Sequence, residues 1–218
     1  MQYQAVVFDM DGVIFDTERL VIEFWKEVAK KHNIPNVEHT CIQCLGTNRV
    51  RTREIFLENY GADFPYDQYR TEVTELFNTH YKGVPLPTKP GVRELLSYLQ
   101  EQDIKVGLAS STAQHLVRDE IGTAGLLPYF QTLVCGDMVE HSKPAPDIFL
   151  KACEILNADP TKSIAIEDSF NGIRSAHCAG MTPIMVPDQV QPTDEIRTLA
   201  FHVMPSLLDV LNWLKTLA

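Results

Sequence analysis

The stretch Ala5-Val6-Val7-Phe8-Asp9-Met10-Asp11-Gly12 decides the fold of this 218-residue chain. Its four apolar residues, 5–8, predict a buried strand, and two aspartates separated by one residue follow directly. In an open α/β sheet ligands bind at the carboxyl ends of the strands, so Asp9 and Asp11 lie where chemistry is expected. Two carboxylates this close repel each other unless a cation shares them or one keeps its proton. The stretch therefore predicts a divalent-metal site, an acid/base pair, or both.

The composition is that of a soluble globular protein, with 44% hydrophobic and 22% charged residues. The length suits one domain, or one domain with an insertion. The N-terminus lacks the basic start and apolar core of a signal peptide, and the apolar runs are too short to span a membrane, so we expect a cytoplasmic protein. The net charge of −10 and the lack of a basic stripe argue against nucleic acid or an anionic membrane as partner.

The spacing of apolar residues divides the chain into two kinds of segment. Between Thr17 and Lys82 it predicts helices, at 17–32, 48–59 and 66–80, and no strand. A segment rich in proline and glycine, 83–91, is typical of a linker. After it helices and strands alternate, with strands expected at 105–109, 132–135, 163–166 and 182–186. Such alternation predicts a parallel sheet with helices on both faces, and the helical insertion can cover the two aspartates.

Polar residues also follow the later predicted strands or stand just before a helix. They are Ser110-Ser111-Thr112, Lys143 and Glu167-Asp168. Each has an ordinary structural explanation: Ser111 or Thr112 as a helix N-cap, Lys143 as a surface cation, and Glu167-Asp168 as acids in the first turn of a helix. Because all of them stand at such positions together with Asp9 and Asp11, a shared site is the better interpretation.

This set of residues is chemically complete for phosphoryl transfer, which needs a nucleophile, neutralised phosphoryl oxygens and an acid for the leaving group. Asp9 can be the nucleophile, and Asp11 can protonate the leaving oxygen and then activate water. Ser110 and nearby backbone N–H groups can bind the phosphoryl oxygens, and Lys143 supplies a fixed positive charge. The acidic pair Glu167-Asp168 can complete an all-oxygen shell suited to Mg²⁺.

The motifs resemble those of the haloacid dehalogenase-like (HAD) superfamily, in its phosphatase and β-phosphoglucomutase-like branch. They are Asp9-x-Asp-Gly-Val-x-x-Asp-Thr17, Lys143-Pro-x-Pro-Asp147, Glu167-Asp-Ser-x-Asn-Gly-Ile173 and Ala179-Gly-Met181. The resemblance implies a Rossmann-like core, residues 1–15 and 84–218, with an all-helical C1-type cap, residues 16–83. It also implies Mg²⁺ as cofactor and a monomeric enzyme. The roles it implies are catalysis by Asp9 and Asp11, phosphate binding by Ser110, Ser111 and Lys143, and Mg²⁺ binding by Asp9, Asp11, Glu167 and Asp168.

An aspartate at position 11 favours phosphomonoester chemistry, because an alcohol leaving group needs a proton. We therefore expect a Mg²⁺-dependent phosphatase that hydrolyses a small phosphate ester, such as a sugar phosphate, through an aspartyl-phosphate. The first alternative is a phosphosugar mutase, since Gly46-Thr-Asn-Arg49 matches a cap segment of β-phosphoglucomutases in which the arginine holds the distal phosphate. That subfamily has a lysine where this chain has Leu45, and a histidine where Val21 or Leu20 stands. The second alternative is an inactive binding protein, which would be free to lose the nucleophile, the acid or the lysine.

The resemblance places candidate substrate-binding residues in the cap at Glu18, Gly46, Arg49 and Arg53. Arg49 and Arg53 lie four residues apart on one face of a predicted helix, and Arg51 is expected to point away. The alternative is a solvated face on which the arginines pair with Glu54 and Glu58.

Five cysteines without a secretion signal indicate reduced thiols. Two of them form a Cys41-x-x-Cys44 pattern, typical of a redox pair or of half a zinc site. No second pair of ligands stands nearby in the sequence, so we favour two semi-buried small residues.

Overall fold

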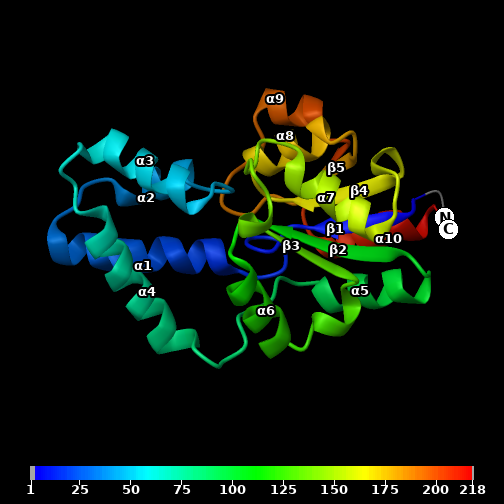
Figure 1. The fold of residues 1–218 in the computed structure, drawn as a ribbon, viewed down its shortest axis with the longest axis horizontal. Coiled ribbons are helices and arrows are strands. Elements are labelled where there is room, and N and C mark those ends of the chain that lie inside the picture. The colour runs from blue at the N-terminus through cyan, green and yellow to red at the C-terminus, as the bar shows by residue number, and fades with distance from the viewer. Residues whose placement is uncertain (1–2, 218) are drawn as a thin grey trace.

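A six-stranded parallel sheet forms the centre of the larger part of the molecule, and four helices stand at one end of it (Figure 1). The computed structural model describes residues 3–217. The strands lie in the order β3-β2-β1-β4-β5-β6, all parallel to their neighbours. Their bounds are β1 Ala5–Phe8, β2 Lys105–Ser110, β3 Thr132–Cys135, β4 Ser163–Glu167, β5 Thr182–Met185 and β6 His202–Val203. The predicted parallel α/β fold is confirmed, and β6 is an addition to it.

Strand β1 lies in the middle of the sheet and is buried on both faces. Val6 and Phe8 face one hydrophobic cluster, and Ala5 and Val7 face another; all four are fully buried. This alternation follows from the two-residue period of a strand. The first cluster is covered by α5 (Val92–Glu101), α6 (Gln114–Thr123) and α10 (Leu207–Lys215), and the second by α7 (Asp147–Leu156) and α8 (Phe170–Cys178).

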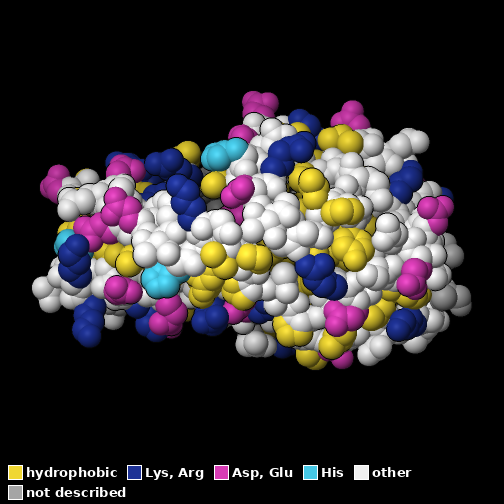
Figure 2. Space-filling view, turned by 90° about the horizontal axis from the view of Figure 1, so that it is seen from below, with side chains coloured by type: hydrophobic (Ala, Val, Ile, Leu, Met, Phe, Trp, Pro, Cys, Tyr) yellow, Lys and Arg dark blue, Asp and Glu magenta, His cyan; other side chains and the backbone are white. Residues whose placement is uncertain are grey.

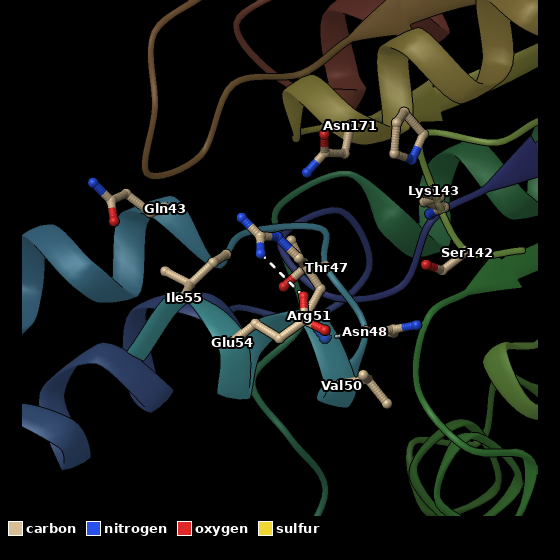
Figure 3. A pocket seen from close by; sticks show the side chains of 11 residues that line it. Gln43, Thr47, Asn48, Val50, Arg51, Glu54, Ile55, Ser142, Lys143 and Asn171 are labelled. Atoms are coloured by element: carbon tan, nitrogen blue, oxygen red, sulfur yellow. Dashed lines mark hydrogen bonds and ion pairs between the residues drawn. The ribbon is translucent and has the colours of Figure 1, made fainter. Parts of the chain in front are cut away.

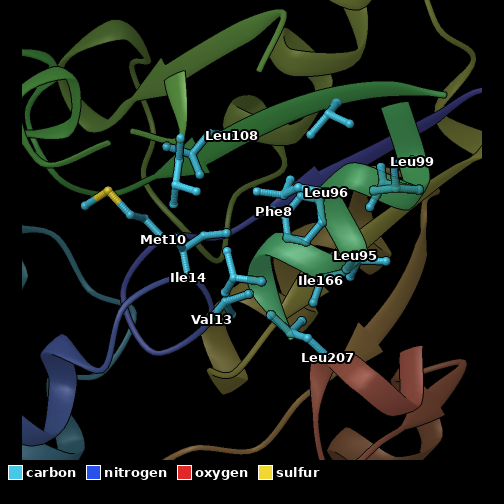
Figure 4. Packing of buried hydrophobic residues seen from close by; sticks show 14 of the residues in the cluster. Phe8, Met10, Val13, Ile14, Leu95, Leu96, Leu99, Leu108, Ile166 and Leu207 are labelled. Atoms are coloured by element: carbon cyan, nitrogen blue, oxygen red, sulfur yellow. The ribbon is translucent and has the colours of Figure 1, made fainter. Parts of the chain in front are cut away.

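Figure 4 shows how tightly the first cluster holds β1. Leu95, Leu96 and Leu99 of α5 pack against Phe8, and none of these side chains is exposed. Burying a side chain of this size contributes roughly 1.5–3 kcal/mol. The aspartates that follow Phe8 are therefore carried by a strand that is fully buried and packed on both faces.

The four helices at the end of the molecule have a hydrophobic core of their own. They are α1 (Thr17–His32), α2 (Val37–Gln43), α3 (Arg49–Tyr60) and α4 (Tyr66–Tyr81). The ring centroid of Trp25 lies 4.4 Å from that of Phe56 and 5.9 Å from that of Tyr66. We call α1–α4 the cap helices. Two short helices, α2 and α9 (Asp194–Leu199), have seven and six residues and were not predicted.

Charged side chains of both signs are spread over the surface seen in Figure 2. Lysine and arginine side chains alternate there with aspartate and glutamate, and no extended field of one sign covers this face. Among the described residues, no helix has the length and hydrophobicity needed to cross a membrane.

Candidate active site

Three neighbouring strands of the sheet bring the predicted site residues together. β1 lies between β2 and β4, and Phe8 at its end is in register with Leu108 and Ile166. Because parallel strands end at the same edge of the sheet, Asp9, Ser110 and Glu167 emerge side by side. The prediction that these motifs share one edge of the sheet is confirmed by this register.

Lys143 is a buried cation at the centre of the site, with 4% of its surface exposed. Its Nζ donates to Asp9 Oδ1, to Glu167 Oε1 at 2.6 Å and to the Ala109 carbonyl at 3.0 Å. Burial alone would lower the pKa of Lys143, but the carboxylates of Asp9 and Glu167 more than offset this and raise it. The lysine therefore stays charged, and the alternative of a surface cation is wrong.

Asp11 is held by two hydroxyl groups, one from each part of the molecule. Thr17 Oγ1, at the start of α1, donates to Asp11 Oδ1 at 2.6 Å, and Thr112 Oγ1, after β2, donates to Asp11 Oδ2 at 3.0 Å. Burial raises the pKa of Asp11, and the two hydroxyls oppose the shift. Because hydrogen bonds to the ionised form favour it, the two threonines adjust how readily Asp11 gives up its proton.

The loop after β2 does not cap the next helix. Helix α6 begins after Ala113, with no side-chain cap, so the interpretation of Ser111 or Thr112 as an N-cap is wrong. Ser110 Oγ instead accepts from the Thr112 N–H at 3.1 Å, which fixes the loop that holds Asp11. The sequence did not predict that the Thr17 and Thr112 hydroxyls bind Asp11. The available signals were that Thr17 closes the first motif and that Thr112 follows a predicted strand.

Glu167 is fully buried and organises the loop after β4. Its Oε2 accepts from the backbone N–H groups of Asp168 and Ser169 at 3.1 Å each, and from Ser169 Oγ at 3.0 Å. Ser169 caps α8, since its Oγ accepts from the Gly172 N–H at 3.0 Å. Glu167 and Asp168 therefore precede the helix and are not first-turn acids, which corrects that interpretation.

Three buried carboxylates could hold a divalent cation. Asp9, Glu167 and Asp168 each offer an oxygen, and these atoms lie within 4.8 Å of one another. Burial, with the neighbouring carboxylates, raises the pKa of Asp9 and of Asp168 well above the ordinary value, although Lys143 opposes the shift at Asp9. Asp168 Oδ2 is buried and has no hydrogen-bond partner among the described residues. An orphaned carboxylate oxygen in an all-oxygen cluster fits Mg²⁺, a hard cation.

A cavity of about 490 Å³ lies between the cap helices and the core (Figure 3). Thr47, Asn48, Arg51 and Glu54 line it from the cap, and Lys143 and Asn171 from the core. The cap touches the core nearby: a Cβ built on Gly46 would lie only 2.3 Å from Ser169 Oγ. A volume of this size suits a small molecule, and Lys143 connects it to the acidic centre.

The arginines are arranged differently from the prediction. Arg51, which was expected to point away from the face that carries Arg49 and Arg53, lines the cavity, and Arg49 and Arg53 are not among the lining residues. Arg51 pairs with Glu54 and Glu58, while Arg53 pairs with Asp67 at 3.2 Å. Substrate contact by Arg49, Arg53 and Gly46 stays a prediction.

Glu18 lies beside the acidic centre. Burial raises the pKa of its carboxyl group, and the neighbouring carboxylates of Asp11 and Asp9 raise it further.

Cys41 is buried and Cys44 half-buried, and both are reduced. Burial raises the pKa of the Cys44 thiol to about 12 and that of Cys41 still higher. Because the thiolate is the reactive and metal-binding form, these cysteines are better suited to packing than to redox chemistry. In the described part of the chain, the only cluster with metal-ligand geometry is the carboxylate set of Asp9, Glu167 and Asp168.

The protein combines a parallel α/β sheet with two strand-end aspartates, a buried lysine and helices inserted after the first strand. This combination defines a class of hydrolases. Residues 6–186 match the model of the haloacid dehalogenase-like hydrolase family, and the chain belongs to this family. It is similar to the phosphorylated carbohydrates phosphatase of Thermotoga maritima, with 34% identity over 83% of each chain. It is also 34% identical to the β-phosphoglucomutase of Bacillus subtilis, over 87% of this chain and 85% of that one.

The fold is similar to a crystal structure of β-phosphoglucomutase from Clostridium difficile. The TM-score is 0.80 at 24% identity, over 98% of this chain and 96% of that one. Together these similarities confirm the predicted family and its phosphatase and β-phosphoglucomutase-like branch, and with them the prediction that the chain is an enzyme of this family.

Proposed function

We propose that the protein is a Mg²⁺-dependent phosphatase that hydrolyses a small sugar or polyol phosphate. The observation that carries the proposal is the pair of carboxyl groups at the end of β1. Asp9 is paired with a buried lysine, and Asp11 is held by two hydroxyls. The first arrangement suits a nucleophile that attacks phosphorus, and the second suits an acid that serves the leaving group.

In the first step an Asp9 carboxylate oxygen forms a bond to phosphorus, and the ester P–O bond breaks. The Asp11 carboxyl gives its proton to the departing alkoxide, so a neutral alcohol leaves. In the second step the Asp11 carboxylate takes a proton from water as the water oxygen attacks the aspartyl-phosphate. The bond between Asp9 and phosphorus then breaks, which releases inorganic phosphate and restores both side chains.

The remaining residues neutralise and orient the phosphoryl group. Lys143 supplies positive charge next to Asp9, and the backbone N–H groups of the Ser110–Ser111 loop can bind phosphoryl oxygens. Asp9, Glu167 and Asp168, with the Asp11 carbonyl, would hold Mg²⁺. When bound, Mg²⁺ would supply further positive charge to the phosphoryl oxygens and keep the carboxylates ionised. Residues 16–83 would act as the cap that excludes water.

A phosphosugar mutase is the second candidate, favoured by the similarity to a β-phosphoglucomutase. A mutase must bind a bisphosphate and retain it while it turns over. Leu45 stands where that subfamily has a lysine, and Val21 or Leu20 stands where it has a histidine. Leu45 is buried, with 7% of its surface exposed. A buried apolar side chain offers no contact to a second phosphate, so we favour the phosphatase.

The test is a ³¹P NMR time course with Mg²⁺ and a pool of sugar phosphates that includes β-glucose 1-phosphate and a trace of glucose 1,6-bisphosphate. A phosphatase converts one ester to inorganic phosphate, and Asp9→Asn abolishes the reaction. Conversion of β-glucose 1-phosphate to glucose 6-phosphate without free phosphate would establish the mutase instead. An absence of any Mg²⁺-dependent change would favour a binding protein.

A further inference from the structure

The cap wall of the cavity carries an arginine whose charge is already neutralised. Arg51 Nη1 donates to Glu54 Oε2 at 3.0 Å and to Glu58 Oε1 at 2.7 Å, and its Nη2 donates to Glu58 Oε2 at 3.2 Å. Glu58 thus holds the guanidinium through both of its oxygens, a geometry that makes an arginine–carboxylate pair stronger and more specific. Arg51 and Glu54 line the cavity, and Figure 3 shows the contact between them.

The cluster of Arg51, Glu54 and Glu58 is negative overall. One guanidinium pairs with two carboxylates, which leaves a formal charge of −1 on the cluster. Arg51 and Glu54 line the cavity, and Glu58 is not one of the lining residues. The other cation of the cavity, Lys143, is committed to Asp9 and Glu167. Neither cation is therefore available to a second anionic group on a substrate whose reacting phosphate lies beside Asp9.

The cavity offers neutral hydrogen-bond donors instead. Asn48 Oδ1 accepts from the Arg51 N–H at 2.9 Å, and Asn171 Oδ1 accepts from Arg174 at 3.5 Å. Their Nδ2 groups make no hydrogen bond to any residue from 3 to 217, and both residues line the cavity from opposite sides (Figure 3). Amide donors of this kind suit hydroxyl oxygens, which accept without carrying charge.

We propose that this enzyme selects a substrate with a single phosphate and an uncharged, hydroxyl-bearing distal end, and that Glu54 and Glu58 exclude substrates with a second anionic group. The discrimination is repulsive: the two carboxylates pair with Arg51 and neutralise it, and Glu54 places negative charge on the cavity wall. The inference rests on the proposed phosphatase function and goes beyond it, because it states which substrates the cap rejects and through which residues.

The test compares kcat/KM for monophosphates and the corresponding bisphosphates. The pairs are fructose 1-phosphate with fructose 1,6-bisphosphate, and glucose 6-phosphate with glucose 1,6-bisphosphate. The wild type should prefer the monophosphate by roughly tenfold or more, and Glu54→Gln/Glu58→Gln should reduce that preference by roughly tenfold. The reduction should be smaller in 0.5 M salt, because these side chains are half-exposed and salt screens them.

The matched control is Glu94→Gln/Glu101→Gln. It removes the same charge from exposed positions of α5 that form no ion pair with any described residue, and it should leave the preference unchanged. Arg51→Gln separates the two possible roles of the arginine. A selective loss of bisphosphate turnover in Arg51→Gln would mean that Arg51 binds the second phosphate, and it would overturn the inference. Equal use of both substrates by the wild type would overturn it as well.

Two further measurements separate this inference from the proposed function. Hydrolysis of p-nitrophenyl phosphate, which has no distal polar group, tests the phosphatase chemistry alone. Calorimetric binding of glucose 1,6-bisphosphate tests the cap without turnover, and the affinity should be higher for Glu54→Gln/Glu58→Gln than for the wild type. If p-nitrophenyl phosphate is not hydrolysed, the function fails while the binding comparison still decides the inference. If it is hydrolysed and the double variant binds no more tightly, the inference fails.

Discussion

Replacing Gly172 with alanine should destabilise the protein, although the same change in a helix is ordinarily favourable. Gly172 lies in α8 and packs against the buried carboxyl group of Glu167. A Cβ at position 172 would lie 1.8 Å from Glu167 Cδ and about as close to both carboxylate oxygens. Since Glu167 is fully buried, its carboxyl group must move away from Lys143 or α8 must shift.

The size of the effect follows from two opposing contributions. Alanine is about 1 kcal/mol better than glycine within a helix. Separating Glu167 from Lys143 breaks a buried ion pair, and such losses cost about 3–5 kcal/mol. The free energy of unfolding should therefore fall by roughly 2–4 kcal/mol, and activity should fall with it because Lys143 also holds Asp9.

Urea unfolding followed by circular dichroism measures this difference. The matched control is Gly122→Ala in α6, where a new Cβ would meet no atom within 4 Å; this variant should be stabilised by roughly 0.5–1 kcal/mol. If Gly172→Ala proved as stable as Gly122→Ala, the argument that Gly172 makes room for the Glu167 carboxyl would be refuted.

Three further predictions concern pH, the acid and the metal. Burial raises the pKa of Glu120 to about 8. The folded state therefore keeps a proton that the unfolded chain loses above about pH 4.3, and stability falls as the pH rises from there to 8. In urea unfolding experiments, the free energy of unfolding of Glu120→Gln should exceed that of the wild type by roughly 1–3 kcal/mol at pH 9 and equal it near pH 4. A difference that does not change with pH would contradict the argument. Thr112→Val removes a hydrogen bond that favours ionised Asp11. As a result kcat/KM should fall roughly tenfold, and the limb of the pH–rate profile that belongs to Asp11 should move to higher pH. Thr198→Val, which removes an exposed hydroxyl, should change neither kcat/KM nor the pH–rate profile. Finally, Mg²⁺ at 100 times its Kd should raise the Tm of the wild type by roughly 5–10 °C in a thermal-shift assay, and EDTA should reverse the rise. Asp168→Asn should abolish the rise in Tm. An equal rise in this variant would show that Asp168 is not a metal ligand.

Long helices and buried apolar strands were predicted well, whereas two short helices and a two-residue strand were not. The sheet, its parallel direction and the helical insertion follow from apolar runs and from helical spacing over ten or more residues. Helices α2 and α9 and strand β6 have seven, six and two residues, too few for a period to be recognised. Val37-Glu-His-Thr-Cys-Ile-Gln43 also contains β-branched residues with low helix propensity, so packing on α1 decides its conformation.

The sequence by itself determined where the candidate site would lie. Asp9, Ser110 and Glu167 could be placed at one edge of the sheet because parallel neighbours end together, and Lys143 was added to them from its place just before a helix. The family, the sheet and the insertion after β1 followed from the same motifs.

Only the tertiary structure decided what each polar side chain contacts. Thr112 was compatible with a helix cap, and in the folded protein its hydroxyl donates to Asp11 instead. Arg49 and Arg53 were the expected substrate contacts, yet the arginine that lines the cavity is Arg51, which pairs with Glu54 and Glu58. Such contacts join residues from different elements or depend on side-chain rotamers. A one-dimensional pattern specifies which face of an element is buried, but which donor meets which acceptor depends on how the elements pack.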